Sequence, residues 1–189
     1  RAGARLKEVS VSSFDAALAT YYVLACAEAS SNLARFDGVK YGERVEGADY
    51  IDTYYKSRTA GFGAEVKRRI MIGNYVLSSG YYDAYYLKAS KVRTKIKADF
   101  DAALGECDFI LGPTSPTTAF EIGKKVKDVT ETYTSDIFTV PVNIAGIPAI
   151  SIPCGKDDKG LPVGLQLIGH AFGEKALFGA AETFEKENA

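Results

Sequence analysis

The chain has 189 residues, of which 47% are hydrophobic and 25% are charged, a balance typical of a globular domain with enough volume for a core. Its 23 basic and 24 acidic side chains give a formal net charge of −1. A protein built mainly to hold nucleic acid would carry a basic surplus, so the composition argues against that class as the main role.

The chain contains no apolar run long enough to cross a membrane. Its longest such run extends from Tyr21 to Ala27, whereas a spanning helix needs roughly 20 apolar residues. The first residues, "RAGARLKEVSVSS", are charged and lack the apolar centre of a signal peptide. We therefore expect a cytoplasmic location and no membrane partner.

The cysteines predict neither a disulfide framework nor a metal site. Cys26, Cys107 and Cys154 are odd in number, widely separated and outside any CxxC motif. This usage is typical of three buried, reduced thiols in a cytosolic protein. No set of zinc ligands can be assembled at a familiar spacing, so we expect no metal.

The first two thirds of the chain predict mainly helices. Alternation in "RLKEVSV" favours a short strand, Leu6 to Val11. A break follows at Phe36-Asp37-Gly38, with Gly38 supplying a turn. The expected helices are Asp15 to Leu33, a segment ending at the Gly61 and Gly63 pair, Ala64 to Leu77, and Tyr82 to Leu104. In the last of these an apolar stripe is expected to face inward: Leu87, Val92, Ile96, Phe100 and Leu104.

After Cys107 the pattern changes to short apolar segments separated by proline and glycine. We expect strands at Phe109 to Leu111, Ala149 to Pro153 and Val163 to Ile168, with "KDDKG" as the turn between the last two. A short helix near Ser135 to Phe138 and a closing amphipathic helix, Glu174 to Glu185, complete the pattern. The fold class is α/β: a mixed sheet of about four strands covered by long helices, in a single domain over residues 1–189. Since no initiator methionine is present and the start looks mid-fold, we expect a fragment of a larger domain.

Three nucleophilic mechanisms can be considered from the residues alone. His170 is the only imidazole, so a cysteine hydrolase would have to pair it with Cys154, yet nothing around Cys154 resembles a nucleophile elbow. No serine has a lysine three residues later, as an S-x-x-K motif requires. The pairs Ser30-Ser31 and Ser78-Ser79 lack the glycine-rich surroundings of an oxyanion hole, and small residues in or near helices favour packing or capping. We therefore expect no catalytic residue in this chain.

Several segments together resemble a known family. They are "AEASSNLARFDGVKYG", "GFGAEVKRRIMIGNYVLSSGYYDAYYLKASKVR", "GPTSPTTAF", "TVPVNIAGIPAISIPCG" and "PVGLQLIG". In this order they resemble the C-terminal part of the A-subunit family of bacterial tRNA-dependent amidotransferases, which belongs to the amidase-signature superfamily. The resemblance covers essentially the whole chain. It implies the C-terminal part of an amidase-signature fold.

The resemblance also implies a reaction and a set of partners. In the family a Lys–cis-Ser–Ser triad hydrolyses the glutamine side-chain amide, and the ammonia converts Glu-tRNA(Gln) or Asp-tRNA(Asn) in a heterotrimer with two other subunits. ATP and magnesium are used by the full complex, and no cofactor is implied for this chain. The Gly/Ser-rich signature that carries the triad is absent here, so the chain alone is expected to be inactive. A general amidase of the same superfamily and a module for subunit assembly remain alternatives.

Free glutamine carries an α-carboxylate and an α-ammonium, so its site calls for an arginine fork and an acidic group. "VKRRIMIG" offers the fork and "YTSDIF" offers the acid. Matching the family's glutamine-contacting positions to this sequence implies Arg69, Asp136 and Tyr21 as substrate-binding residues. The neighbouring Arg68 and Tyr22 remain alternatives, as do a solvated helix face for Arg69, a helix cap for Asp136 and core packing for Tyr21.

Overall fold

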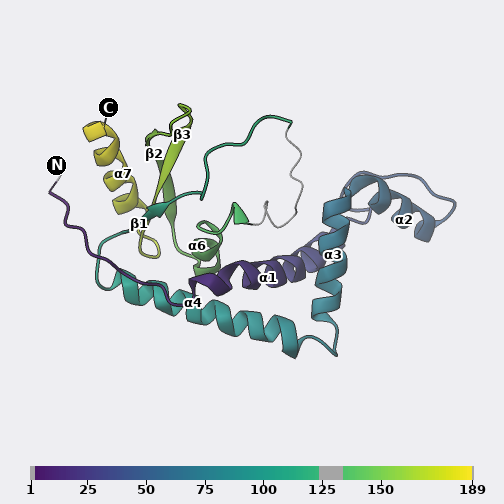
Figure 1. The fold of residues 1–189 in the computed structure, drawn as a ribbon. Helices are drawn as coiled ribbons and strands as arrows, with labels where there is room; N and C mark the ends of the chain where they lie inside the picture. Colours follow the sequence, from purple (N-terminus) through teal and green to yellow (C-terminus); the bar gives the residue numbers. More distant parts are fainter. Residues whose placement is uncertain (1–2, 124–133, 189) are drawn as a thin grey trace. The chain divides into compact units, whose positions relative to one another are not determined.

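The computed structural model describes residues 3–123 and 134–188 (Figure 1). The chain forms two compact units, and each is described by itself. We call Thr20–Lys91 the helical unit, and Arg1–Ala19 with Val92–Ala189 the sheet unit. Two compact units can belong to one domain, so the expected single domain stays a prediction.

The long helices are the best predicted elements of the chain. The first helix, α1, spans Ala17–Asn32 and lies between two 3₁₀ turns, η1 at Phe14–Ala16 and η2 at Leu33–Arg35. The stretch expected as a helix from Tyr82 contains a π-helical turn before the α-helix begins. The other helical elements before the sheet are α2 (Tyr50–Gly61), α3 (Ala64–Leu77), η3 (Asp83–Leu87) and α4 (Lys88–Leu104), and the bounds of α3 match the prediction at both ends.

In the helical unit α1 and α3 approach each other closely at Gly73. A Cβ atom placed on Gly73 would lie 2.0 Å from the Cys26 carbonyl oxygen and 2.7 Å from the Ser30 Cβ. Ser30 is buried, and its hydroxyl donates a hydrogen bond to the Ala27 carbonyl at 2.8 Å. Ser78 likewise donates to the Tyr75 carbonyl at the end of α3. The interpretation of Ser30 and Ser78 as packing and helix-end residues is confirmed.

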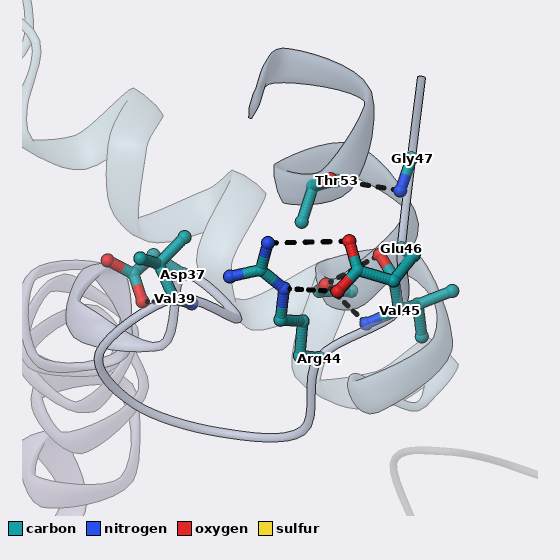
Figure 2. Close-up of polar contacts among 8 residues, drawn as sticks. Asp37, Val39, Arg44, Val45, Glu46, Gly47 and Thr53 are labelled. Atoms are coloured by element: carbon teal, nitrogen blue, oxygen red, sulfur yellow. Dashed lines mark hydrogen bonds and ion pairs between the residues drawn. The ribbon is translucent and has the colours of Figure 1, made fainter. Parts of the chain in front are cut away.

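The loop between α1 and α2 is held by side chains that bond its backbone (Figure 2). The Asp37 carboxylate accepts hydrogen bonds from the backbone N–H groups of Val39 and Lys40 at 2.9 Å, and of Tyr41 at 3.3 Å. These bonds hold the pKa of Asp37 below its ordinary value. Gly38 adopts φ +74°, the left-handed conformation that favours glycine. The predicted turn at Asp37-Gly38 is confirmed.

The sheet unit contains a three-stranded antiparallel sheet in the order β1-β3-β2. The strands are β1 (Ile110–Pro113), β2 (Ala149–Lys156) and β3 (Pro162–Ile168). The closing helix, α7 (Glu174–Asn188), packs against one face of this sheet (Figure 1). The core between them consists of Ile152, Leu167, Leu177 and Ala181, with Phe109, Ile150, Leu165, Ala180 and Phe184 packed around it.

The prediction of a strand at Leu6 to Val11 was wrong. These residues belong to no strand or helix, and Leu6 is 89% exposed. The segment is attached through side chains instead: Lys7 pairs with Glu106, and Asp99 accepts hydrogen bonds from both Ser12 and Ser13. Because this segment is attached through side chains, its backbone makes no strand-to-strand hydrogen bonds with the sheet. The described sheet therefore has three strands rather than about four.

The short helix expected near Ser135 to Phe138 begins later. These residues form turns, and the helix α6 spans Val140–Ala145. Its proline lies in the first turn, where a missing N–H costs no hydrogen bond, and Gly146 ends it with φ +70°.

Two further details of the sequence prediction need correction. Only the C-terminal part of the expected stripe is buried, at Ile96, Phe100 and Leu104, whereas Leu87 is 37% exposed and Val92 is half-buried. The three cysteines are free thiols, but only Cys26 is buried, while Cys107 is half-buried and Cys154 is exposed. A pattern that places a residue near apolar neighbours in sequence does not decide whether another element covers it.

The close approach at Gly73 predicts a strong effect of adding one methyl group. Gly73→Ala should lower the free energy of unfolding by about 3 kcal/mol, because the new Cβ overlaps the backbone of α1. Gly179→Ala is a matched control, since a Cβ there meets nothing within 4 Å on the exposed face of α7. Gly179→Ala should raise the free energy of unfolding by roughly 0.5–1 kcal/mol, because alanine favours the helix more than glycine does. Urea unfolding measures both, and equal midpoints for the two variants would contradict the packing described.

The Asp37 turn predicts a defined dependence of stability on pH. Because the folded-state pKa of Asp37 is lowered, its stabilising contribution is complete above the ordinary aspartate pKa of about 3.9 and is lost as pH falls through the folded pKa. The difference in stability between the wild type and Asp37→Ala should therefore shrink under acid. An NMR titration of the Asp37 carboxyl carbon gives the pKa directly. A midpoint at or above the ordinary value would show that the three backbone bonds do not form in solution.

Candidate functional site

Two of the three expected substrate-binding residues, Arg69 and Tyr21, lie together in the helical unit. Arg69 is on α3 and Tyr21 is on α1. The Arg69 Nε donates a hydrogen bond to Glu65 at 2.9 Å, and its guanidinium also hydrogen-bonds the Tyr21 side chain. The guanidinium carbon lies 5.7 Å from the centre of the Tyr22 ring. We call Tyr21, Tyr22, Glu65 and Arg69 the arginine cluster.

The charges in the arginine cluster reinforce one another. Glu65 accepts hydrogen bonds from Arg69 and also from Arg68, whose Nη2 lies 2.6 Å away. These bonds hold the pKa of Glu65 below its ordinary value, with Arg69 making the larger contribution. The bond to Glu65, and then the bond to Tyr21, raise the pKa of Arg69 despite its partial burial. Glu65 and Arg69 are therefore both charged at neutral pH.

The structure gives the neighbouring arginines and tyrosines different surroundings. The Arg69 side chain is 31% exposed and the Arg68 side chain is 47% exposed. Tyr21 and Tyr22 are both half-buried, and their rings pack edge to face with centroids 5.2 Å apart. The Tyr21 hydroxyl hydrogen-bonds the Arg69 guanidinium, whereas the Tyr22 side chain faces the guanidinium with the face of its ring. Arg69 is therefore more enclosed than a solvated helix residue.

Asp136, the third expected residue, belongs to the sheet unit and is exposed. Its backbone carbonyl accepts hydrogen bonds from the backbone N–H groups of Thr139 and Val140 and from the Thr139 hydroxyl. Its carboxylate accepts a long bond of 3.4 Å from the Ser135 hydroxyl. The position before α6 is occupied by Thr139, and no side chain caps that helix. The helix-cap alternative for the Asp136 carboxylate is therefore wrong.

A residue that sequence reasoning missed, Gln166, contacts the segment that follows Asp136. Gln166 lies on β3 and is only 6% exposed. Its Nε2 donates a hydrogen bond of 3.1 Å to the Phe138 carbonyl. The available signal was a single amide in the otherwise apolar strand "VGLQLI", because a buried polar side chain needs a partner.

The pairing of Cys154 with His170 is excluded by the register of the sheet. Cys154 lies close to the β2–β3 turn, where Pro153 pairs with Gly164, whereas His170 follows the opposite end of β3. Several residues at roughly 3.3 Å each separate the two positions along the strand.

Within residues 3–123 and 134–188, no group of three or more His, Cys, Asp or Glu side chains could hold a metal ion. In the same ranges, no helix combines the length and the apolar character that a membrane span requires.

Comparison with known proteins gives close relatives over almost the whole chain. The A subunit of the glutamyl-tRNA(Gln) amidotransferase of Pelagibacter ubique is 60% identical over 98% of this chain, and that of Microcystis aeruginosa is 57% identical over 97%. The chain spans 38% of the length of each of these relatives. The resemblance inferred from the sequence is thereby confirmed.

Solved structures agree with the expected fold class. The crystal structure of the glutamyl-tRNA(Gln) amidotransferase A subunit from Thermotoga maritima is 45% identical, with a TM-score of 0.65 over 93% of this chain and 33% of that one. A crystal structure of an amidase, 22% identical, has a TM-score of 0.71 over 97% of this chain and 38% of that one, and supports the fold alone. The family model described as Amidase matches residues 1–178. The chain therefore belongs to the amidase family.

Proposed function

We propose that this chain is part of the glutaminase subunit of a tRNA-dependent amidotransferase. In the full-length protein this subunit would hydrolyse the side-chain amide of glutamine and supply ammonia for converting Glu-tRNA(Gln) to Gln-tRNA(Gln). The proposal is supported by the 57–60% identity to proteins named as the A subunit of glutamyl-tRNA(Gln) amidotransferase. Because the chain spans 38% of their length, the activity is proposed for the larger protein.

The observation that carries the role of this chain is the arginine cluster together with the neighbouring Arg68. Arg68 and Arg69 share the single carboxylate of Glu65, so two positive charges and one negative charge leave a net charge of +1. One α-carboxylate would balance that charge. A guanidinium has five N–H donors, more than Glu65 and Tyr21 can use, so donors remain for a substrate. In this proposal Arg69 binds the α-carboxylate of glutamine and Tyr21 orients the guanidinium.

Asp136 is proposed to bind the α-ammonium group of glutamine. Its carboxylate is exposed and does not cap α6, so it can accept hydrogen bonds from a charged ligand. Charge-assisted hydrogen bonds of this kind are about twice as strong as neutral ones. Recognition of both charged groups would allow the protein to bind free glutamine in preference to simple amides, which lack them.

The remaining parts of the reaction are proposed to lie outside this chain. The catalytic Lys–Ser–Ser triad would come from the rest of the full-length protein, so this chain alone would not hydrolyse glutamine. Two partner subunits would complete a cytoplasmic heterotrimer that binds Glu-tRNA(Gln). ATP and magnesium would be used there and not by these residues.

Arg69→Ala in the full-length protein should raise the KM for glutamine by roughly 10- to 100-fold, because a hydrogen bond to a charged group contributes about 1.5–3 kcal/mol. The value of kcat should change little, since the α-carboxylate is bound equally in the ground state and the transition state. Steady-state ammonia release at varied glutamine concentration measures both constants.

Arg68→Ala is the matched control for Arg69→Ala, because it removes a neighbouring arginine that shares Glu65 but is more exposed. Its KM should rise by less than about fivefold. An unchanged KM in Arg69→Ala would exclude the assigned role, and a larger effect of Arg68→Ala would transfer that role to Arg68.

The division of labour can be tested by comparing this chain alone with the full-length protein and its partner subunits. Ammonia release from glutamine should be confined to the full-length protein. Simple aliphatic amides should be poor substrates, since they lack both charged groups. Release by the isolated chain at an enzyme-like rate would refute the proposal, and a preference for aliphatic amides without partner subunits would indicate a general amidase.

A further inference from the structure

We propose that Gln166 is a positioning residue for Asp136, and that it sets the affinity for the α-ammonium group of the substrate. The inference rests on the proposed glutamine-binding role of Asp136. It is carried by the hydrogen bond from the buried Gln166 side chain to the Phe138 carbonyl, two residues after Asp136.

Gln166 is held in place by strands on both sides. It lies in the central strand of the sheet and pairs with Gly112 of β1 on one side and with Ser151 of β2 on the other. Its neighbours Leu165 and Leu167 face the core under α7. Because side chains alternate along a strand, Gln166 points to the opposite face, toward Phe138.

The segment from Asp136 to Thr139 is a turn with two kinds of attachment. Within the turn, the Asp136 carbonyl accepts bonds from Thr139 and Val140. Outside it, the Gln166 amide holds the Phe138 carbonyl, and the Phe138 ring packs against Phe14 with centroids 6.1 Å apart. The turn is therefore braced internally and is anchored to the sheet by Gln166.

The Asp136 carboxylate depends on this anchor for its position. The carboxylate is exposed, and its bond to the Ser135 hydroxyl is long at 3.4 Å. The backbone of the turn therefore decides where the carboxylate lies. A shift of about 1 Å in a substrate-positioning group can reduce its contribution by as much as 100-fold. Loss of the Gln166 donor would leave the Phe138 carbonyl unpaired and release the turn.

The decisive variant is Gln166→Met in the full-length protein with its partner subunits. Methionine keeps the length of the side chain and removes the donor. The KM for glutamine should rise by about tenfold, with kcat within about twofold of the wild type, because the ammonium group is bound equally before and during the reaction. Added to Asp136→Asn, the same substitution should raise KM no further, since Gln166 acts through Asp136.

A ligand without the ammonium group separates positioning from general damage. The monoamide of glutaric acid keeps the carboxylate and the amide of glutamine but has no α-ammonium. Its inhibition constant should be the same for the wild type and Gln166→Met. Ile152→Val serves as the stability control, since it trims the core on the other face of the sheet and should leave KM unchanged. If Gln166→Met unfolds, Thr139→Val removes another bond of the same turn and should raise KM in the same way.

The outcomes distinguish this inference from the proposed function. If Asp136→Asn leaves KM unchanged, the glutamine-binding role of Asp136 is wrong. If Asp136→Asn raises KM and Gln166→Met does not, the positioning role of Gln166 is overturned. The positioning role is also overturned if the effects of Gln166→Met and Asp136→Asn on KM multiply in the double variant. It is likewise overturned if Gln166→Met weakens the binding of glutamine and of the monoamide equally.

Discussion

The pairing of β3 on both of its edges is the constraint on which the sheet unit depends. With β1 on one side and β2 on the other, the register of β3 is fixed along its length. Leu165 and Leu167 are thereby directed into the core, and Gln166 is directed to the opposite face. A slip by one residue would exchange the two faces. The burial of the core therefore also fixes the polar contact that reaches the turn after Asp136.

The helical unit depends on a different device, the bonding of loop backbone by side chains. The loop between α1 and α2 has no regular structure after η2, so its N–H and carbonyl groups need other partners. The hydroxyl of Thr53 accepts a hydrogen bond from the Gly47 N–H (Figure 2). The hydroxyl of Ser57 accepts one from the Val45 N–H. Arg58 donates to the carbonyls of Leu33 and Phe36, at 3.0 and 2.9 Å. A few residues of α2 thus keep the loop ordered.

The sequence predicts local structure well and tertiary contacts poorly, for physical reasons. Capping and glycine signals are local, so both ends of α3 and the start of α7 could be placed. The segment Leu6 to Val11 has a strand-like pattern, yet a strand also needs a paired partner, which alternation cannot supply. For Gln166 the sequence shows a lone amide in an apolar strand but not the carbonyl it meets, 28 residues earlier in the chain. Arg69 and Tyr21 could be paired only through resemblance to a family, because helical periodicity does not join α1 to α3.

The geometry around Arg69 explains why an arginine suits this position better than a lysine. The Tyr22 ring lies against the guanidinium at 5.7 Å, within the distance at which a ring attracts a cation. With a ring at that face, a carboxylate gains most by approaching in the guanidinium plane, where two parallel N–H donors can bind it. The bond to Glu65 fixes the rotation of that plane, and the raised pKa of Arg69 keeps it charged. A lysine ammonium has neither a plane that can stack on a ring nor two parallel N–H donors. Glu65, Tyr21 and Tyr22 could therefore not orient a lysine for binding a carboxylate as they orient Arg69.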